Sequence, residues 1–173
     1  MKAEEEMLPV LDEEGNVTGK APRSLCQSHS GILHPVVHLH IIKSDRSGLL
    51  LQKRALTKQI QPGKWDTSVG GHVSFGEKIA EALKREAAEE ASIASFNPVS
   101  LTSYKFESEI ERELINCFAC IAPEDYVPVA EKGEADSLRF WSWPEIEDAL
   151  GQNIFTPNFE HEYQMIQHLL KDI

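Results

Sequence analysis

Residues 71–93 read GHVSFGEKIAEALKREAAEEASI and hold a dense group of carboxylates. From residue 78 to residue 91 the stretch is rich in Ala, Glu, Lys, Leu and Arg and contains neither Pro nor Gly, which predicts a helix. On that helix Glu86, Glu89 and Glu90 share one face, because they are spaced at i, i+3 and i+4. Carboxylates this close together repel one another unless a cation lies between them. The spacing therefore predicts a site for a hard divalent cation, Mg²⁺ or Mn²⁺, which takes oxygen ligands.

The same stretch resembles the Nudix box, G-x5-E-x7-R-E-U-x-E-E-x-G-U, in which U is a bulky aliphatic residue. The positions that match are Gly71, Glu77, Arg85, Glu86, Glu89, Glu90 and Ile93. Two positions depart from the pattern, since Ala87 replaces a larger aliphatic residue and Ser92 replaces the closing glycine. Ala87 should weaken the core packing, and Ser92 should be strained if the helix ends there with a positive φ. Neither change removes a candidate metal ligand.

The resemblance implies a role for each matching position. The metal ligands would be Glu86, Glu89, Glu90 and the backbone carbonyl of Gly71. Glu86 is also a candidate catalytic base. Arg85, next to Glu86 in the sequence, is also counted among the catalytic candidates. We expect it to act chiefly through a structural ion pair with Glu77, which would hold the loop against the helix. The alternative is an ordinary solvated helix. In that case Gly71 and Arg85 would match the positions of the box pattern only by chance.

The resemblance also implies a fold and a reaction. The fold would be an α/β/α sandwich with a mixed β-sheet, formed by residues 1–173 as one domain. The reaction would be hydrolysis of a nucleoside or other organic diphosphate linked to a second group, by water attack on phosphorus with Mg²⁺ or Mn²⁺ as cofactor. Two alternatives stay open, namely an isomerase of prenyl diphosphates and a domain that binds a nucleotide without catalysis.

Two carboxylates outside the box are candidates for the catalytic base or for a further ligand. Glu113 forms an E-x-E pattern with Glu111 in an expected strand over residues 110–122, so both side chains would point the same way. Glu134 lies in the loop EKGEAD, before the expected strand LRFWSW. The alternative for each is an ordinary surface glutamate.

Residues 7–150, and above all the stretch ALTKQIQPGKWDTSVGGH, look like the branch of the family that includes isopentenyl-diphosphate isomerase. In that isomerase the segment before the box reads SVCGH, and its cysteine carries the proton chemistry. Here the segment reads SVGGH, so Gly70 stands in place of the cysteine. Because glycine cannot transfer a proton, and because this box keeps its charged pairs, we expect a hydrolase on an isomerase-like scaffold.

The isomerase binds a metal through histidines and an E-x-E pair. By this resemblance a second metal site would comprise His29, His34, His72, Glu111 and Glu113. His29 matches only loosely, because its spacing to His34 differs. Imidazole and carboxylate together suit Mn, Fe or Zn better than Mg. The alternative, which we favour, is that these histidines are polar or core residues without a metal.

The remaining sequence predicts a layered α/β domain, with strands before and after a central helix and another helix at the end. A hairpin is expected over residues 7–21, and an arm or short helix over 22–33. Further strands are expected over 34–43, 49–53, 66–70, 96–106 and 138–143. Helices are expected over 144–150 and 157–171, the second with Thr156 as its N-cap.

Composition narrows the range of functions. The chain has 173 residues and a net charge of −11, which argues against a protein that binds nucleic acid by neutralising phosphates. Metal ions can still supply local positive charge for a small phosphorylated substrate. The sequence has neither an apolar run of membrane-spanning length nor a signal-like N-terminus. Three cysteines imply no disulfide framework, so a reducing cytoplasm is expected. A homodimer is compatible with the resemblance.

Overall fold

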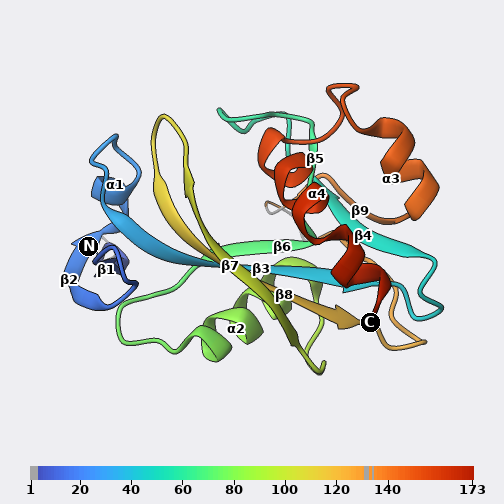
Figure 1. The fold of residues 1–173 in the computed structure, drawn as a ribbon, viewed down its shortest axis with the longest axis horizontal. Coiled ribbons are helices and arrows are strands. Elements are labelled where there is room, and N and C mark those ends of the chain that lie inside the picture. The colour runs from blue at the N-terminus through green and yellow to red at the C-terminus, as the bar shows by residue number, and fades with distance from the viewer. Residues whose placement is uncertain (1–3, 131–132, 134) are drawn as a thin grey trace.

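The computed structural model describes residues 4–130, 133 and 135–173 (Figure 1). The helices and strands are, in chain order, β1 (Met7–Leu11), β2 (Val17–Pro22), α1 (Arg23–Cys26), β3 (Leu33–Ile42), β4 (Gly48–Lys53), β5 (Trp65–Asp66), β6 (Val69–His72), α2 (Ile79–Ala91), β7 (Val99–Glu107), β8 (Arg112–Ile121), β9 (Ser137–Ser142), α3 (Trp143–Ala149) and α4 (Pro157–Lys171). None of the helices in this part of the chain is long and apolar enough to cross a membrane.

The main sheet has the strand order β5-β4-β3-β8-β7, with β6 paired to β3 and β9 paired to β4. The central strand β3 runs parallel to β8 and antiparallel to β4 and β6. The predicted mixed sheet is therefore confirmed. The strand expected over residues 66–70 is two short strands, because the chain crosses from β4 to β3 at Ser68. The Ser68 hydroxyl accepts from the backbone N–H of Ile41 and donates to the carbonyl of Leu50, which spans the two strands.

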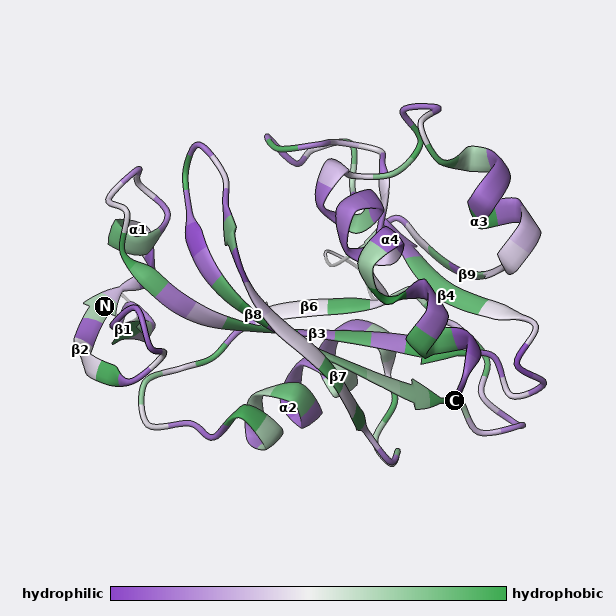
Figure 2. Cartoon of the chain, viewed as in Figure 1, coloured by the Kyte–Doolittle hydropathy of each residue, from purple (hydrophilic) through white to green (hydrophobic). Residues whose placement is uncertain are grey.

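Helices cover both faces of this sheet, as Figure 1 shows for α2 on one side and for α3 and α4 on the other. The odd-numbered residues Val37, Leu39 and Ile41 of β3 pack with the core that α2 completes. The even-numbered Ile42 packs with the core formed by α3 and α4, together with the hydrophobic stretch of β4 that is green in Figure 2. Because successive side chains of a strand alternate between faces, β3 is buried on both sides. The α/β/α sandwich is thereby confirmed.

The N-terminal hairpin β1–β2 forms a separate two-stranded sheet that lies with α1 at one end of the molecule (Figure 1). The carbonyl of Met7 accepts from the backbone N–H of Phe75 at 2.8 Å, and the carboxylate of Glu6 accepts from the Ser74 hydroxyl at 2.7 Å. These bonds tie the segment before the hairpin to the loop between Gly71 and α2. At the other end of the chain Thr156 caps α4, as predicted, by accepting from the N–H of Phe159 at 3.2 Å.

Helix α2 ends at Ser92, which has φ 54° and ψ 34° and so adopts the left-handed conformation. The N–H of Ile93 donates to the carbonyl of Ala87 at 3.3 Å, which closes the last turn. The expected strain at Ser92 is therefore present. Ala87 is fully buried, so the small side chain at this position faces the core as the box pattern requires.

Replacing Ser92 by glycine is expected to raise the free energy of unfolding by about 1 kcal/mol, because glycine adopts the left-handed conformation without a steric penalty. Chemical denaturation measures the change. Ser95→Gly is the matched control, since Ser95 is an exposed residue of the same loop and does not have a positive φ. An equal rise in the free energy of unfolding from both substitutions would mean that the gain does not come from the left-handed conformation at the helix end.

Candidate active site

Arg85 organises the loop between β6 and α2. Its Nε and Nη2 atoms lie 2.9 Å from the two carboxylate oxygens of Glu77, a bidentate pair. Nη1 lies 2.7 Å from Oε1 of Glu86, and Nη2 donates to the carbonyl of His72 at 3.1 Å. The guanidinium thus connects the loop, the last residue of β6 and the carboxylate face of α2. The structure places Glu77 and Arg85 in the ion pair that the box pattern implies.

The three box carboxylates lie along one cleft but differ in their surroundings. Glu86 faces Gly71, where a Cβ atom would overlap its carboxyl group, and its side chain is 14% exposed. Glu90 accepts from the backbone N–H of Gly70 at 3.0 Å. Glu89 is 53% exposed and lies 3.5 Å from Arg85. Two carboxylates therefore converge on the end of β6, and the third faces the solvent side of the same site.

Burial affects the ionisation of the Glu86 carboxylate. Loss of solvent raises the pKa of Glu86, and the nearby Arg85 guanidinium offsets this only in part. A divalent cation between Glu86 and Glu90 would stabilise the charged form that burial disfavours. The oxygen donors of the box face therefore fit Mg²⁺ or Mn²⁺.

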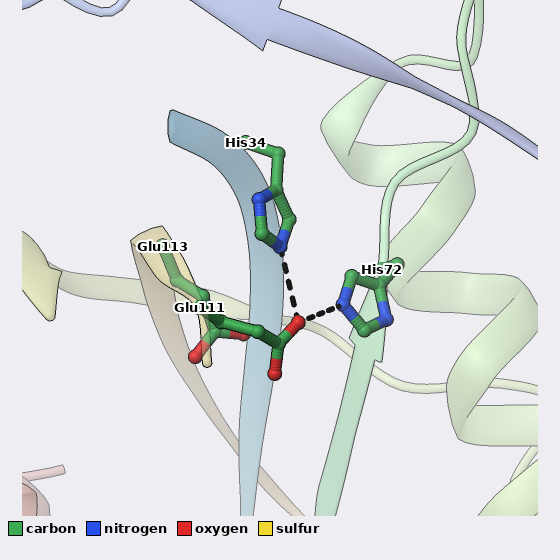
Figure 3. Close-up of side chains that lie close together, drawn as sticks. All are labelled: His34, His72, Glu111 and Glu113. Carbon is green, nitrogen blue, oxygen red and sulfur yellow. Dashed lines mark hydrogen bonds and ion pairs between the residues drawn. The ribbon is translucent and has the colours of Figure 1, made fainter. Parts of the chain in front are cut away.

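A second group of ligand atoms lies in the same region (Figure 3). His34 on β3, His72 on β6, Glu113 on β8 and Glu111 just before β8 place their ligand atoms within 4.8 Å of one another. Oε1 of Glu111 lies 3.3 Å from Nε2 of His34 and 3.1 Å from Nε2 of His72. The two imidazole rings stack with centroids 5.3 Å apart. The E-x-E pair and two of the three predicted histidines therefore come together.

The hydrogen bonds of His34 show that this group fits a metal ion. Nδ1 lies 3.0 Å from the carbonyl of Ile32, which can only accept, so Nδ1 carries a proton. In the neutral ring, Nε2 then presents a lone pair to the carboxylate of Glu111. Lone pairs that face each other need a proton or a cation between them, and a backbone partner on the second nitrogen is typical of metal-binding histidines.

Protonation of His34 can balance part of the negative charge of this group. Burial disfavours the charged form of Glu111, yet the hydrogen bonds from His34 and His72 outweigh it and lower the Glu111 pKa. Burial likewise lowers the pKa of His34, but the hydrogen bond to Glu111 raises it overall. The pKa of Glu113 is raised by burial and by the charge of Glu111. Protons and a metal ion would compete for the same positions.

His29 does not join this group. The ring of this exposed residue contacts the backbone carbonyl of Glu109, and the ligand atoms that converge on Glu111 do not include it. The reason is local, because the chain turns at His29 and Gly31, both with positive φ, before β3 begins. Including His29 in the predicted set was therefore wrong. Glu134, the other predicted carboxylate, lies outside the described residues.

Sequence reasoning missed Glu162, a buried carboxylate of α4 that hydrogen-bonds to His38 and His40. His38 lines the cleft, whereas His40 is fully buried beneath it. One signal was available in the sequence. Glu162 falls between Phe159 and Tyr163 on the apolar face of the expected helix, where a charged residue is rare unless it is paired.

The cleft has a volume of about 860 Å³, a size suited to a small molecule. Its wall includes the three box carboxylates together with His72, Glu111 and Glu113. Cationic side chains also line it, namely Arg23, Arg54 and Lys58. A ligand in this cleft would therefore meet both carboxylates and cationic side chains, a combination that suits a phosphorylated compound bound with a divalent cation.

Comparison with known proteins is consistent with this geometry. A family model described as NUDIX domain matches residues 33–168. An isopentenyl-diphosphate Delta-isomerase of Corynebacterium efficiens is 30% identical over 151 residues, which cover 84% of this chain and 79% of that protein. An uncharacterized Nudix hydrolase of Yersinia pestis is 29% identical over 140 residues, covering 81% of this chain and 74% of that protein.

A solved structure shares the fold. The crystal structure of DR0079 from Deinococcus radiodurans matches with a TM-score of 0.74 over 92% of this chain and 98% of that chain, at 21% identity. The segment that the family model matches contains the box helix and the E-x-E pair that line the cleft. This chain therefore belongs to the Nudix family of hydrolases.

Proposed function

We propose that this protein hydrolyses a small organic diphosphate linked to a second group, with Mg²⁺ or Mn²⁺ as its cofactor. The observation that carries the proposal is the convergence of Glu86 and Glu90 on Gly70 and Gly71 inside the cleft. When bound there with Glu89 as a further ligand, the cation would neutralise phosphate charge and polarise the phosphoryl group.

Side chains of the protein would position the carboxylates and accept the proton of the attacking water. Arg85 holds Glu86 in place through their 2.7 Å contact, so that its carboxylate keeps a fixed position. Glu113 is the better candidate for the base that takes a proton from the attacking water. It lines the cleft, and burial raises its pKa, which makes it a stronger base than an ordinary glutamate. Glu86 is the alternative base.

Two features support hydrolysis over isomerisation, the activity named for the relative from Corynebacterium efficiens. Gly70 occupies the position at which the isomerase carries cysteine, and it has no group that can transfer a proton. A Cβ atom at Gly70 would also lie only 3.3 Å from Cδ2 of His38, so this wall leaves little room for a side chain. The proposed substrate is a small phosphorylated compound rather than a nucleic acid polymer. The proposed location is the cytoplasm.

The test is hydrolysis of a panel of nucleoside triphosphates, dinucleoside polyphosphates, nucleotide sugars, ADP-ribose and prenyl diphosphates, with Mg²⁺ or with a chelator, followed by chromatography of the monophosphate products. We expect turnover of one substrate class that needs the metal and falls about 100-fold or more in Glu90→Gln, because a ligand oxygen is lost. A proton-exchange assay on isopentenyl diphosphate runs in parallel. Exchange without hydrolysis would favour the isomerase, and binding without either reaction would favour a nucleotide-binding domain.

A second candidate function is transition-metal binding by His34, His72, Glu111 and Glu113, supported by the orientation of His34 described above. Protein incubated with Mn²⁺ or Zn²⁺ and then dialysed should retain about one metal ion per chain, measured by mass spectrometry of the elements. His72→Ala should lose it. His29→Ala is the matched control and should retain it, because His29 lies outside the group. Equal retention by both variants would contradict the assignment.

A further inference from the structure

Glu162 is a carboxylate with no exposed surface, on the face of α4 that packs against the sheet. Burying an ionised carboxylate is strongly unfavourable unless charge and hydrogen bonds compensate it. The pKa of Glu162 is nevertheless held well below its usual value, because the imidazoles of His38 and His40 outweigh the effect of burial. The surrounding groups therefore keep this buried residue negatively charged.

Four donors surround that carboxylate. Nδ1 of His38 lies 2.9 and 3.1 Å from its two oxygens, Nε2 of His40 lies 2.6 Å away, and the hydroxyl of Tyr104 lies 2.6 Å away. The thiol of Cys117 provides the fourth hydrogen bond. A carboxylate only accepts, so His38 must carry its proton on Nδ1.

A metal ion is the competing explanation, because ligand atoms of His38, Cys117 and Glu162 lie within 4.8 Å of one another. The hydrogen bonds argue against it. Four donors occupy the lone pairs of the carboxylate, and burial beside Glu162 raises the pKa of the Cys117 thiol, which disfavours the thiolate that a metal needs. The group is therefore better described as an anion surrounded by donors.

Only one of the four donors also lines the cleft. The side chain of His38 is 12% exposed and belongs to the cleft wall. With Nδ1 directed at Glu162, the opposite ring nitrogen Nε2 lies beside Gly70, 3.5 Å from where a Cβ atom would stand. Gly70 in turn donates its N–H to Glu90. His38 and the box carboxylates line the same cleft.

The charge of His38 follows from its neighbours. Burial lowers the pKa of His38, but the carboxylate of Glu162 outweighs burial and raises it to about 9. Other charged or titratable groups near the ring are Glu113 and Cys117 on β8, Tyr104 on β7, Asp66 on β5 and His40 on β3. Among these, the carboxylates of Glu113 and Asp66 act in the same direction as Glu162.

We propose that His38 is a substrate-binding cation, whose Nε2–H donates to a phosphate oxygen of a diphosphate bound in the cleft, and that Glu162 is the residue that positions it. The inference rests on the proposed function, since it concerns the same cleft. A charged donor fixed in a site of low dielectric binds an anionic oxygen more strongly than the same group in water.

Binding of methylenediphosphonate, a diphosphate that cannot be hydrolysed, tests the inference without requiring turnover. Calorimetry in Mg²⁺ should show affinity reduced about tenfold or more in His38→Ala, the effect expected for one charge-assisted hydrogen bond. His38→Gln, which keeps a neutral donor, should recover part of the loss. His168→Gln is the control, because His168 is an exposed residue of the same helix as Glu162. It should bind like the wild type.

Nitrogen NMR of the His38 ring adds a readout that a purely structural role would not change. Both ring nitrogens should be protonated at neutral pH in the wild type, and methylenediphosphonate should shift the Nε2 signal. In Glu162→Gln the proton count should fall and the affinity should drop with it. Equal binding by the wild type and His38→Ala would overturn the inference alone. No binding by the folded wild type would overturn both the inference and the proposed diphosphate site.

Discussion

Gly71→Ala is expected to lower kcat/KM about 10³-fold while the protein stays folded. The new Cβ atom would overlap the carboxyl carbon and both oxygens of Glu86. The Glu86 carboxyl must therefore shift away from Gly71, which disturbs its 2.7 Å contact with Arg85. A displacement of about 1 Å at a reacting centre costs about 100-fold, and a lost metal ligand adds to it. The combined loss corresponds to about 4 kcal/mol of transition-state stabilisation.

The backbone at Gly71 does not have a positive φ, so alanine introduces no conformational strain there. Thermal unfolding should therefore show a stable protein, and steady-state kinetics should show the loss. Gly19→Ala is the matched control, since nothing lies within 4 Å of a Cβ atom at that strand position. Activity of Gly71→Ala within tenfold of the wild type would mean that the position of Glu86 does not matter for the reaction.

Glu162→Gln is expected to lower the free energy of unfolding by about 3–5 kcal/mol near pH 6, because it leaves the donors of His38 and His40 without their buried anion. The folded-state pKa of Glu162 is below its usual 4.5, so its contribution is present above pH 4.5 and is lost as the pH falls. The pKa of His38 is raised from 6.5 to about 9, so its contribution is complete below pH 6.5 and is lost as the pH rises through 9.

The difference between wild type and Glu162→Gln should therefore be largest between pH 4.5 and 6.5 and smaller above pH 9. Chemical denaturation of both proteins at pH 6 and at pH 9.5 measures it. Glu124→Gln makes the same change of charge at an exposed position and should have little effect at either pH. A difference that stays constant with pH would mean that the histidine and the carboxylate are not linked in the folded protein.

Local chemistry explains why so much of the fold could be predicted. The box helix is an unbroken run of strong helix formers, and α4 begins with Thr156 and Pro157, a capping residue and a proline suited to the first turn. The strand over 34–43 is an apolar run of the kind that a central strand covered on both faces requires. The prediction was incomplete at residues 66–70, where Ser68 spans two neighbouring strands and divides the segment in two.

The candidate site also contains groups that the sequence could place and one that it placed incorrectly. Glu86, Glu89 and Glu90 could be grouped from the sequence because their spacing on one helix is fixed by 3.6 residues per turn. The pairing of Glu77 with Arg85 also lies within one loop and one helix. His29 was placed with the metal group on spacing across a turn, and a turn with positive φ directs its side chain elsewhere.

Periodicity, helix formers and caps along the chain determined the layered fold and the carboxylate face of α2, because each depends on residues a few positions apart. The pairing of His38 with Glu162, 124 residues away, required the packing of α4 against β3. The meeting of His34 with Glu111 likewise required the parallel register of β3 and β8. Contacts between distant segments depend on how the layers pack, and that packing decided which polar groups share a buried site.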